Sequence, residues 1–583
     1  MQERGSKIME KRAKQAVIGT LLVLVLILVL GAVTLVKYLS PGKEKMSLAD
    51  YYHVPAGEAM IILDDKIYEK NAMIFGGELY VDFDTVVQRF NKRFYWDNAE
   101  QVLIYTTPTE VIKARPQENS IEINGEKNAC DHPVITEKGG VLYLLLDFVA
   151  EYSDISYRAY SAEEGTVQRV LITSVYGDYL YTNVVKKTQL RTDADRKSPI
   201  LKEMAEGEKL MLLDGGGSQK NGYLTVMTED GVRGYVLNKC VSEGYYEKLI
   251  SDFKPPVYTS AADGEEVLLV WHVVTNSTAN GNLAGLIANT KGVTVVSPTW
   301  FSIASNDGAI SSLADSGYVE TAHGLGLKVW GLVDNFGENI DSYAILSSTT
   351  ARERLEKELV SVALSCGMDG INIDFESLPV EAGPHFIQFL RELSVSLRKH
   401  GLVLSVDNYV PAGYNKYYDF AEQGVVADYV IIMAYDEHYS GSAEAGSVSS
   451  ISYVENAISD TKEMVPADKI IVALPFYTRL WKETNVDGVT VLKVERTPGM
   501  ADAAAILKEN GVEAEWDETT CQNYAEFDKD GAHYRIWLED ERSLAEKAGR
   551  VRQAELAGIG AWRLGLETKG VWDVFAGQIN EGE

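Results

Sequence analysis

Cysteine and positive charge are scarce in this chain of 583 residues. Four cysteines are too few for a disulfide-rich scaffold, and their wide spacing favours isolated thiols over pairs. Lys and Arg total 55 against 85 Asp and Glu, for a net charge of −30. Such a surface repels phosphate backbones, so nucleic-acid binding is disfavoured. With 46% hydrophobic residues the composition is that of a folded protein, and the length predicts about three or four domains.

One long apolar run lies near the N-terminus. Residues 16–36 carry no charge and are long enough to cross a hydrocarbon core as a helix. The run is longer than the apolar part of a cleaved signal and lacks an evident cleavage site, which favours a transmembrane anchor over a signal peptide. Basic residues in the segment 1–15 predict a cytoplasmic tail. We therefore expect the rest of the chain to lie outside the membrane.

Two smaller regions follow this run. Residues 75–173 hold a weak repeat in which Gly76–Val81 is echoed by Gly139–Leu144. The segment of about 58–173 predicts a small α+β domain and resembles the N-terminal domain of copper amine oxidases, without a visible copper-ligand cluster. Residues 187–243 alternate short strands and turns, which predicts a small all-β barrel, and resemble a bacterial Src-homology-3-like domain. The alternative for this second region is a spacer without a ligand.

The region of about 265–583 alternates apolar strand-like runs with helical stretches. Eight such runs predict a (β/α)8 TIM barrel, an α/β fold whose site lies at the carboxyl ends of the strands. A gap of about 482–557 is too long for one crossover, so we expect an inserted α+β subdomain there. The eight runs are Val267–Thr275, Val293–Phe301, Lys328–Phe336, Gly370–Glu376, Val403–Val410, Tyr429–Tyr435, Lys469–Tyr477 and Gly558–Leu564.

The most informative stretch is Asp369–Glu376, on the fourth predicted strand. Alternate residues of a strand share a face, so Asn372, Asp374 and Glu376 point one way, while the residues between them are apolar. In a barrel the polar set faces the lumen, where acids are costly to bury unless they are used or well hydrogen-bonded. The alternative is a polar strand end exposed at the barrel mouth. Asp369 has the opposite parity, which predicts a structural role.

The stretch resembles the signature of glycoside hydrolase family 18, D-x-x-D-x-D-x-E. The resemblance covers nearly the whole of residues 265–583 and is strongest to spore-cortex and cell-wall hydrolases. It includes segments on four further predicted strands, in the same order along the chain. These are Ser297–Phe301, Ser405–Tyr409, Met433–Asp436 and Gly560–Arg563.

The resemblance implies a retaining hydrolysis in which the acetamido carbonyl of the substrate attacks the anomeric carbon. Glu376 would be the single proton donor, and Asp374 would raise its pKa and hold the acetamido N–H. Tyr435 would hydrogen-bond the carbonyl oxygen, and the sugar would stack on Trp562. The other candidates for substrate binding are Asn372, Asp436, Asn408, Tyr409 and Trp300.

Asn372 departs from the family pattern, which has a second Asp at this position. In the usual arrangement the two acids can share a proton. Because a neutral amide removes one like charge, we expect Asp374 to ionise more readily in this chain. The amide can still hold Asp374 by hydrogen bonds, so the departure is compatible with activity.

These observations predict a membrane-anchored, extracytoplasmic hydrolase that faces the cell wall and cleaves β-1,4 bonds next to N-acetylglucosamine. The glycan would be peptidoglycan or chitin-like, and the anchor and the Src-homology-3-like module favour peptidoglycan. We expect no metal and no cofactor. One alternative is a catalytically inactive glycan-binding scaffold, although such relatives typically lack the terminal acid. Another is metal-dependent hydrolysis through Asp374 and Glu376, for which the histidines offer no metal-ligand spacing.

Overall fold

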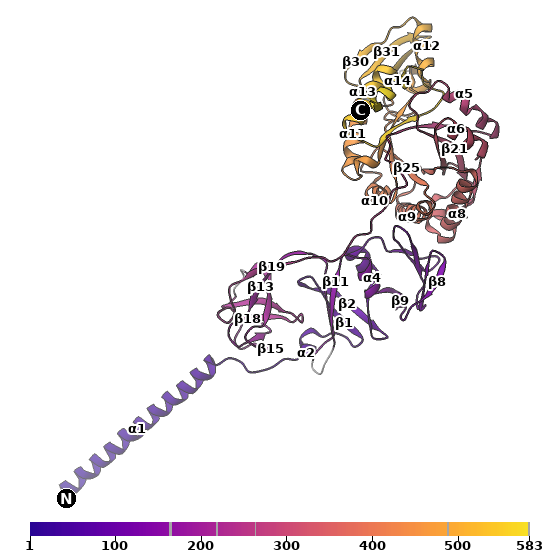
Figure 1. Cartoon of the computed structure of the whole chain (residues 1–583). Helices are drawn as coiled ribbons and strands as arrows, with labels where there is room; N and C mark the ends of the chain where they lie inside the picture. Colours follow the sequence, from indigo (N-terminus) through magenta and orange to yellow (C-terminus); the bar gives the residue numbers. More distant parts are fainter. Residues whose placement is uncertain (162–165, 217–219, 263, 487–488, 581–583) are drawn as a thin grey trace. The chain divides into compact units, whose positions relative to one another are not determined.

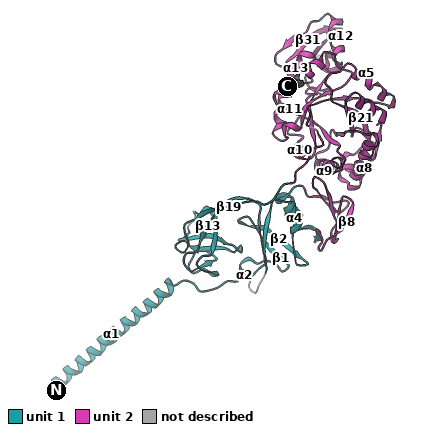
Figure 2. Cartoon of the chain, in the orientation of Figure 1, with its two compact units in different colours: residues 1–92, 135–255 teal, residues 93–134, 256–583 magenta. Residues whose placement is uncertain are grey.

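The chain folds into two compact units in a computed structural model that describes residues 1–161, 166–216, 220–262, 264–486 and 489–580. One unit comprises residues 1–92 and 135–255, and the other residues 93–134 and 256–583 (Figures 1 and 2). The predicted domain of about 58–173 is therefore divided, because its central part belongs to the second unit. The four cysteines are unpaired.

The N-terminal helix α1 spans Gln2–Leu39 and contains the predicted run 16–36 (Figure 1). None of its residues is buried within the structure. By length and composition it is the one helix among the described residues that could cross a membrane, a test that a signal sequence also passes.

The first unit contains two seven-stranded sheets. In the first sheet, β3 and β10 from the two repeat copies pair antiparallel, with Val81 opposite Leu144, so the halves of the repeat pair with each other. The sheet order is β11-β12-β1-β2-β3-β10-β9, with β1 Glu58–Leu63, β2 Lys66–Phe75, β3 Glu78–Asp82, β9 Ile135–Lys138, β10 Val141–Leu145, β11 Ser156–Tyr160 and β12 Arg169–Thr173. The short helices α3 Phe83–Thr85 and α4 Leu146–Glu151 accompany it, whereas α2 Leu48–Tyr52 contributes Leu48 to the apolar cluster of the second sheet.

The second sheet of this unit is antiparallel throughout. Its inward residues, among them Leu190, Leu210, Val226 and Val236, are buried in one apolar cluster. The order is β15-β14-β18-β17-β16-β13-β19, with β13 Gly177–Asn183, β14 Thr188–Arg191, β15 Ile200–Met204, β16 Lys209–Leu212, β17 Tyr223–Thr228, β18 Arg233–Leu237 and β19 Tyr245–Leu249.

In the second unit, eight parallel strands close into a barrel. All eight predicted runs are confirmed. The strands are β20 Val267–His272, β21 Val295–Ile303, β23 Lys328–Asp334, β24 Gly370–Asp374, β25 Val403–Tyr409, β26 Tyr429–Met433, β27 Ile470–Pro475 and β33 Gly558–Trp562, with β22 Ile310–Ser312 added antiparallel to β21. The helices are α5 Leu283–Ile287, α6 Ser316–Gly324, α7 Ser342–Ser347, α8 Thr349–Cys366, α9 Gly383–Lys399, α10 Phe420–Val426, α11 Ile451–Lys462, α13 Glu541–Gln553 and α14 Val571–Asn580.

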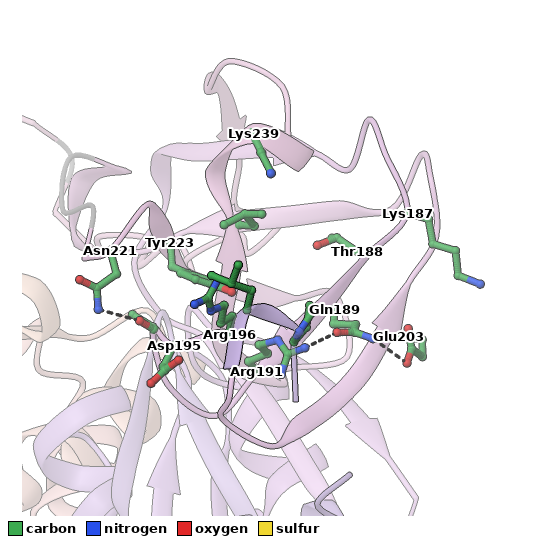
Figure 3. Close-up of a pocket in the computed structure, with 14 residues that line it drawn as sticks. Lys187, Thr188, Gln189, Arg191, Asp195, Arg196, Glu203, Asn221, Tyr223 and Lys239 are labelled. Atoms are coloured by element: carbon green, nitrogen blue, oxygen red, sulfur yellow. Dashed lines mark hydrogen bonds between the residues drawn. The ribbon is translucent and has the colours of Figure 1, made fainter. Parts of the chain in front are cut away.

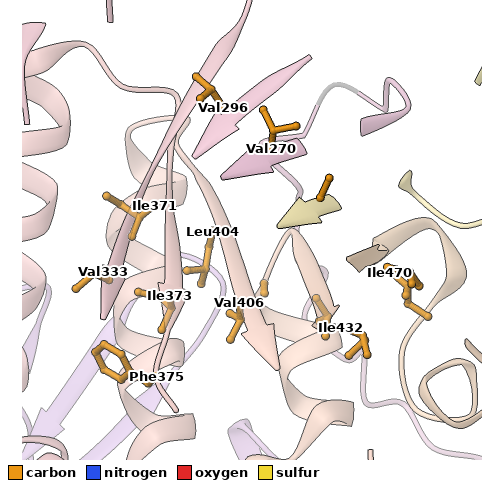
Figure 4. Close-up of a cluster of buried hydrophobic side chains, with 14 of the residues drawn as sticks. Val270, Val296, Val333, Ile371, Ile373, Phe375, Leu404, Val406, Ile432 and Ile470 are labelled. Carbon is orange, nitrogen blue, oxygen red and sulfur yellow. The ribbon is translucent and has the colours of Figure 1, made fainter. Parts of the chain in front are cut away.

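Strand parity divides the barrel core into two layers. Apolar residues of one parity, such as Ile371, Ile373 and Val406, pack between the strands and the helices (Figure 4). Residues of the other parity, such as Trp271 and Ile431, fill a separate apolar cluster in the lumen. The polar residues of β24 and β25 therefore lie in the lumen, next to this apolar cluster.

The predicted insertion is a five-stranded antiparallel sheet with one helix, but it is shorter than expected. It runs from Leu480 to Leu538, after which α13 packs against β27 and β33 as a barrel helix. The insertion was predicted to end at residue 557 because this helix was counted as part of it. Residues 487–488 of the insertion lie outside the described residues. The sheet order is β29-β28-β32-β31-β30, with β28 Leu480–Val486, β29 Val489–Arg496, α12 Met500–Asn510, β30 Glu515–Asp517, β31 Gln522–Lys529 and β32 Ala532–Leu538.

Residues 93–134 form an antiparallel five-stranded sheet that packs on the barrel helices. Asp97 accepts hydrogen bonds from the backbone N and the hydroxyl of Thr349, at 2.9 and 2.6 Å, at the first residue of α8. Glu100 accepts one from the backbone N of Thr350 at 2.8 Å. The sheet therefore caps the start of α8. Its strands are β4 Tyr95–Asp97, β5 Val102–Thr106, β6 Val111–Ala114, β7 Ser120–Ile123 and β8 Glu126–Ala129.

Arg352 of α8 joins this sheet to the barrel helices. Its side chain is 0% exposed and forms a bidentate ion pair with Glu392 of α9, with N···O distances of 2.9 and 3.2 Å. The remaining N–H groups donate to the Tyr95 hydroxyl, the Leu346 carbonyl and the Thr349 hydroxyl. All five donors of the guanidinium are thus satisfied.

Candidate active site

A polar cluster occupies the carboxyl-terminal end of the barrel lumen. Asn372 and Asp374 come from β24, Glu376 follows it directly, and Tyr409 ends β25. The hydroxyl of Tyr409 donates to Oε2 of Glu376. The polar residues alternate with apolar ones that pack outside the barrel, so the expected parity of this strand is confirmed. The mouth-exposed alternative does not hold for Asn372 and Asp374, which are buried.

Asn372 is held by three side chains of the lumen. Its Oδ1 accepts from Nε1 of Trp271 at 2.9 Å and from the Ser297 hydroxyl at 3.1 Å, and its Nδ2 donates to Oδ1 of Asp407 at 2.8 Å. Because an indole nitrogen can donate but not accept, the amide orientation is fixed. Asn372 is therefore tied to Asp407 of the neighbouring strand.

Asp374 carries an oxygen that its surroundings leave unsatisfied. Among the described residues Oδ1 has no hydrogen-bond partner, although it is buried. Burial raises the pKa of Asp374 well above its usual value, and the charges of Asp407, Glu376 and Asp334 raise it further. The prediction that Asn372 makes Asp374 ionise more readily did not include Asp407, which supplies a like charge from the next strand.

Glu376 is placed at the edge of a cavity of about 510 Å³. Asn335 fixes its backbone from both sides, accepting from the N of Glu376 and donating to its carbonyl, each at 2.9 Å. Burial raises the pKa of the Glu376 carboxyl, the nearby Asp436 adds to this, and the hydrogen bond from Tyr409 opposes it. The cause of the raised pKa is thus mainly burial, where the sequence suggested the charge of Asp374.

The next strands bring the aromatic candidates to the same end of the barrel. Tyr435, directly after β26, lies edge-on to Tyr477, with 6.2 Å between ring centroids, and the charge of Asp374 acts on it. Trp562, the last residue of β33, lies 5.8 Å from Trp271 and belongs to the lumen cluster. Tyr435 and Trp562 therefore lie at the same end of the barrel as Asp374 and Glu376.

Asp436 follows Tyr435 with a positive φ of 61°. It accepts a hydrogen bond from the Tyr477 hydroxyl and forms an ion pair with Arg479 at 2.7 Å. This side chain is therefore engaged with the residues that lead into the insertion.

Two candidates for substrate binding do not reach the lumen. Trp300 is buried against Tyr318 outside the barrel, and its Nε1 donates to Asn280 at 2.8 Å. Asn408 exchanges hydrogen bonds with Gln423 of α10. Since Asn408 and Tyr409 are consecutive in one strand, they cannot share a face. Both candidates are therefore corrected to structural residues.

Asp369 has the structural place that its parity predicts. Its Oδ2 accepts from the backbone N of Val329 at 2.7 Å and lies 2.9 Å from Nε2 of His323. Among the described residues no group of three or more His, Cys, Asp or Glu has an arrangement that could hold a metal ion.

Sequence reasoning missed Asp407 and Asn335. Asp407 lies two residues from Tyr409, so strand parity alone could have placed it in the lumen. Asn335 acts through its contact with the Glu376 backbone, and no pattern in the sequence pairs these two positions.

A second cavity lies in the first unit, apart from the barrel residues. It measures about 820 Å³ and is bordered by charged side chains of the antiparallel sheet, Arg191 and Glu203, and of its connections, Lys187, Arg196 and Lys239 (Figure 3). None of the candidate residues from the sequence lies there.

Comparison with known proteins agrees with the barrel and its signature. The model of glycosyl hydrolases family 18 matches residues 275–567, half of the chain, and that of the copper amine oxidase N-terminal domain matches residues 62–167. This chain belongs to glycosyl hydrolases family 18.

Two relatives come from Bacillus subtilis. YdhD, named as a sporulation-specific glycosylase, is 31% identical over 292 residues, which are 47% of this chain and 66% of that protein. The cortical fragment-lytic enzyme is 28% identical over 243 residues, 40% of this chain and 56% of that protein. The crystal structure of YdhD aligns with a TM-score of 0.43 and 28% identity, covering 46% of this chain and 91% of that one. The chain thus spans about two thirds or less of these two relatives.

Proposed function

We propose that this protein hydrolyses β-1,4 bonds next to N-acetylglucosamine by a retaining, substrate-assisted mechanism. The observation that carries the proposal is the buried Oδ1 of Asp374, which has no partner among the described residues, beside the carboxyl of Glu376. A buried polar atom without a partner is costly, and an acetamido N–H would satisfy it.

The first half of the reaction forms an oxazolinium ion. The acetamido carbonyl oxygen attacks C1, the bond between C1 and the leaving oxygen breaks, and Glu376 passes its proton to that oxygen. The raised pKa favours the protonated form of Glu376, which this step requires. Asp374 accepts the acetamido N–H and balances the positive charge, Tyr435 donates to the carbonyl oxygen, and Trp562 supports the sugar ring.

The second half returns Glu376 to its starting state. Its carboxylate takes a proton from water, the water oxygen attacks C1 from the face that the leaving group occupied, and the C1–O bond to the acetamido oxygen breaks. Two displacements at C1 leave the configuration unchanged.

The glycan we propose is peptidoglycan. This choice is supported by the names of the relatives, one sporulation-specific and one cortical fragment-lytic. Phe336, which is 59% exposed at the cavity beside Glu376, offers a further aromatic surface for a sugar on the leaving-group side.

We also propose that α1 anchors the protein in the cell membrane, with residues 1–15 in the cytoplasm and the barrel facing the wall. Its apolar composition supports this. The antiparallel sheet of residues 177–249 supports a Src-homology-3-like module between anchor and barrel.

The test is to incubate the full-length chain, in detergent, with purified peptidoglycan and with chitin oligosaccharides, and to identify new reducing ends by mass spectrometry. We expect N-acetylglucosamine ends from peptidoglycan and none from the Glu376→Gln variant, which lacks the proton donor. Oligomers without acetamido groups should resist cleavage, because they lack the internal nucleophile. The matched control is Glu463→Gln, at an exposed glutamate of the barrel surface.

Cleavage by Glu376→Gln at the wild-type rate would refute the assignment of the acid. Equal cleavage of deacetylated oligomers would refute substrate assistance. Sugar binding without any cleavage by the wild type would favour the scaffold alternative.

A further inference from the structure

Asp407 is a buried acid of the lumen to which the proposed reaction gives no task. It lies on β25 between Ser405 and Tyr409, on the lumen side, and is buried. Strands β24 and β25 pair in parallel, with Asn372 opposite Ser405 and Ile373 opposite Val406. Continuing this register places Asp374 level with Asp407, on strands that are about 5 Å apart.

The amide of Asn372 is matched to this acid. Its oxygen is engaged by Trp271 and Ser297, so its NH₂ group must face Asp407, where it finds an acceptor 2.8 Å away. An Asp at position 372 would instead set two acceptors against each other at this contact. The departure from the family signature thus goes together with an acid on the neighbouring strand.

We propose, on the basis of the function proposed above, that Asp407 supplies from β25 the acid that position 372 lacks, and that Asp407 and Asp374 share one proton across the two strands. Two carboxylates side by side in a dry lumen cannot both be ionised at low cost. A shared proton leaves the pair with one negative charge, which is what Asp374 needs to balance the developing positive charge. Asp407 is thus a positioning residue that acts through Asp374.

The surroundings of the pair agree with a shared proton. The titratable groups that act on it are Glu376 beside Asp374, Asp334 at the end of β23 and Tyr435 after β26. Burial and these acids raise the pKa of both carboxyls of the pair, and the hydrogen bond from Asn372 only partly offsets this for Asp407. Among the described residues no Lys or Arg acts on either carboxyl of the pair as a cause of these pKa shifts.

The test combines infrared spectroscopy with kinetics on the full-length protein. The carbonyl stretch of a protonated carboxyl is measured at pH 7 as a difference between wild type and Asp407→Asn, so that protonated carboxyls elsewhere cancel. Glu356 is one of these, because burial raises its pKa to about 7. We expect the variant to lose one protonated carboxyl, because Asp374 alone then ionises.

The kinetic measurements test whether the acid can be moved from position 407 to position 372. In Asp407→Asn we expect kcat to fall about tenfold or more with little change in KM, because the neighbouring acid that raises the pKa of Asp374 is then absent. The double variant Asn372→Asp/Asp407→Asn returns the acid to β24 and should recover the infrared signal and most of kcat. The control is Asp428→Asn, a buried acid that accepts from the backbone N of Leu404, which should keep the signal.

Each outcome is decisive. An unchanged infrared signal in Asp407→Asn, or a double variant no better than the single one, would overturn the inference. If the single variant does not fold, Asp407→Glu, which keeps a carboxyl at this position, replaces it in the difference spectrum, and the shared-proton signal should persist both in this variant and in the double variant. If the wild type cleaves no glycan but the signal disappears in Asp407→Asn, the proposed function fails and the shared proton stands.

Discussion

Replacing Arg352 by Met should destabilise the barrel unit strongly, because the guanidinium is buried and fully hydrogen-bonded. Glu392, which is 2% exposed, then loses the hydrogen bond that Nε of Arg352 donates to its Oε2. Its Oε1 keeps a hydrogen bond from Gln388 at 2.9 Å. Removing one member of a buried ion pair costs about 3–5 kcal/mol, because the other charge stays buried without compensation. We therefore expect the free energy of unfolding to fall by about that amount.

The assay follows tryptophan fluorescence during urea unfolding. All nine tryptophans of the chain lie in residues 93–134 and 256–583, so the signal reports this unit alone. The double variant Arg352→Met/Glu392→Met removes both charges and should be far closer to the wild type than Arg352→Met, since an apolar replacement of both partners is often neutral. A loss below about 1 kcal/mol in Arg352→Met, the size of a surface ion pair, would refute the reasoning.

Two further predictions concern pH. Tyr409→Phe removes a hydrogen bond that lowers the pKa of Glu376. The alkaline limb of the pH profile of kcat/KM should therefore move to higher pH. A shift to lower pH, or the same shift in the control Tyr524→Phe, would contradict this. Burial lowers the pKa of His272 to about 4, so this imidazole stays neutral in the folded state, whereas in the unfolded chain it binds a proton below pH 6.5. Unfolding followed by fluorescence should therefore lose up to about 3 kcal/mol of stability between pH 6.5 and pH 4, and His272→Gln should flatten this dependence.

The barrel could be predicted from the sequence because its strands are continuous apolar runs between helices. The alternation of polar and apolar residues in Asp369–Glu376 also placed Asn372 and Asp374 correctly in the lumen, and Glu376 follows them, half-buried at the edge of a cavity. Local patterns of this kind depend on strand geometry alone, which the sequence reveals.

The errors have physical reasons of two kinds. Asn408 and Trp300 were chosen because they lie in matching segments, although strand parity turns both away from the lumen. The hydrogen bond of Asn372 to Asp407 joins two strands, and the packing of residues 93–134 on α8 depends on contacts some 250 positions apart in the chain. Contacts of this range leave no periodic signal in a single sequence.

The placement of residues 93–134 affects how this protein can be cut. The chain passes between its two units three times, at residues 92/93, 134/135 and 255/256. A cut near residue 255 would break the only covalent link to residues 256–583, and the packing of residues 93–134 on the barrel helices would then hold the two fragments together. A fragment beginning at residue 256 would also lack Tyr95 and Asp97, and would leave Arg352 and the start of α8 without their partners. The barrel of this protein is thus not an independent fragment, because its compact unit includes residues 93–134, which precede residues 135–255 of the other unit in the sequence.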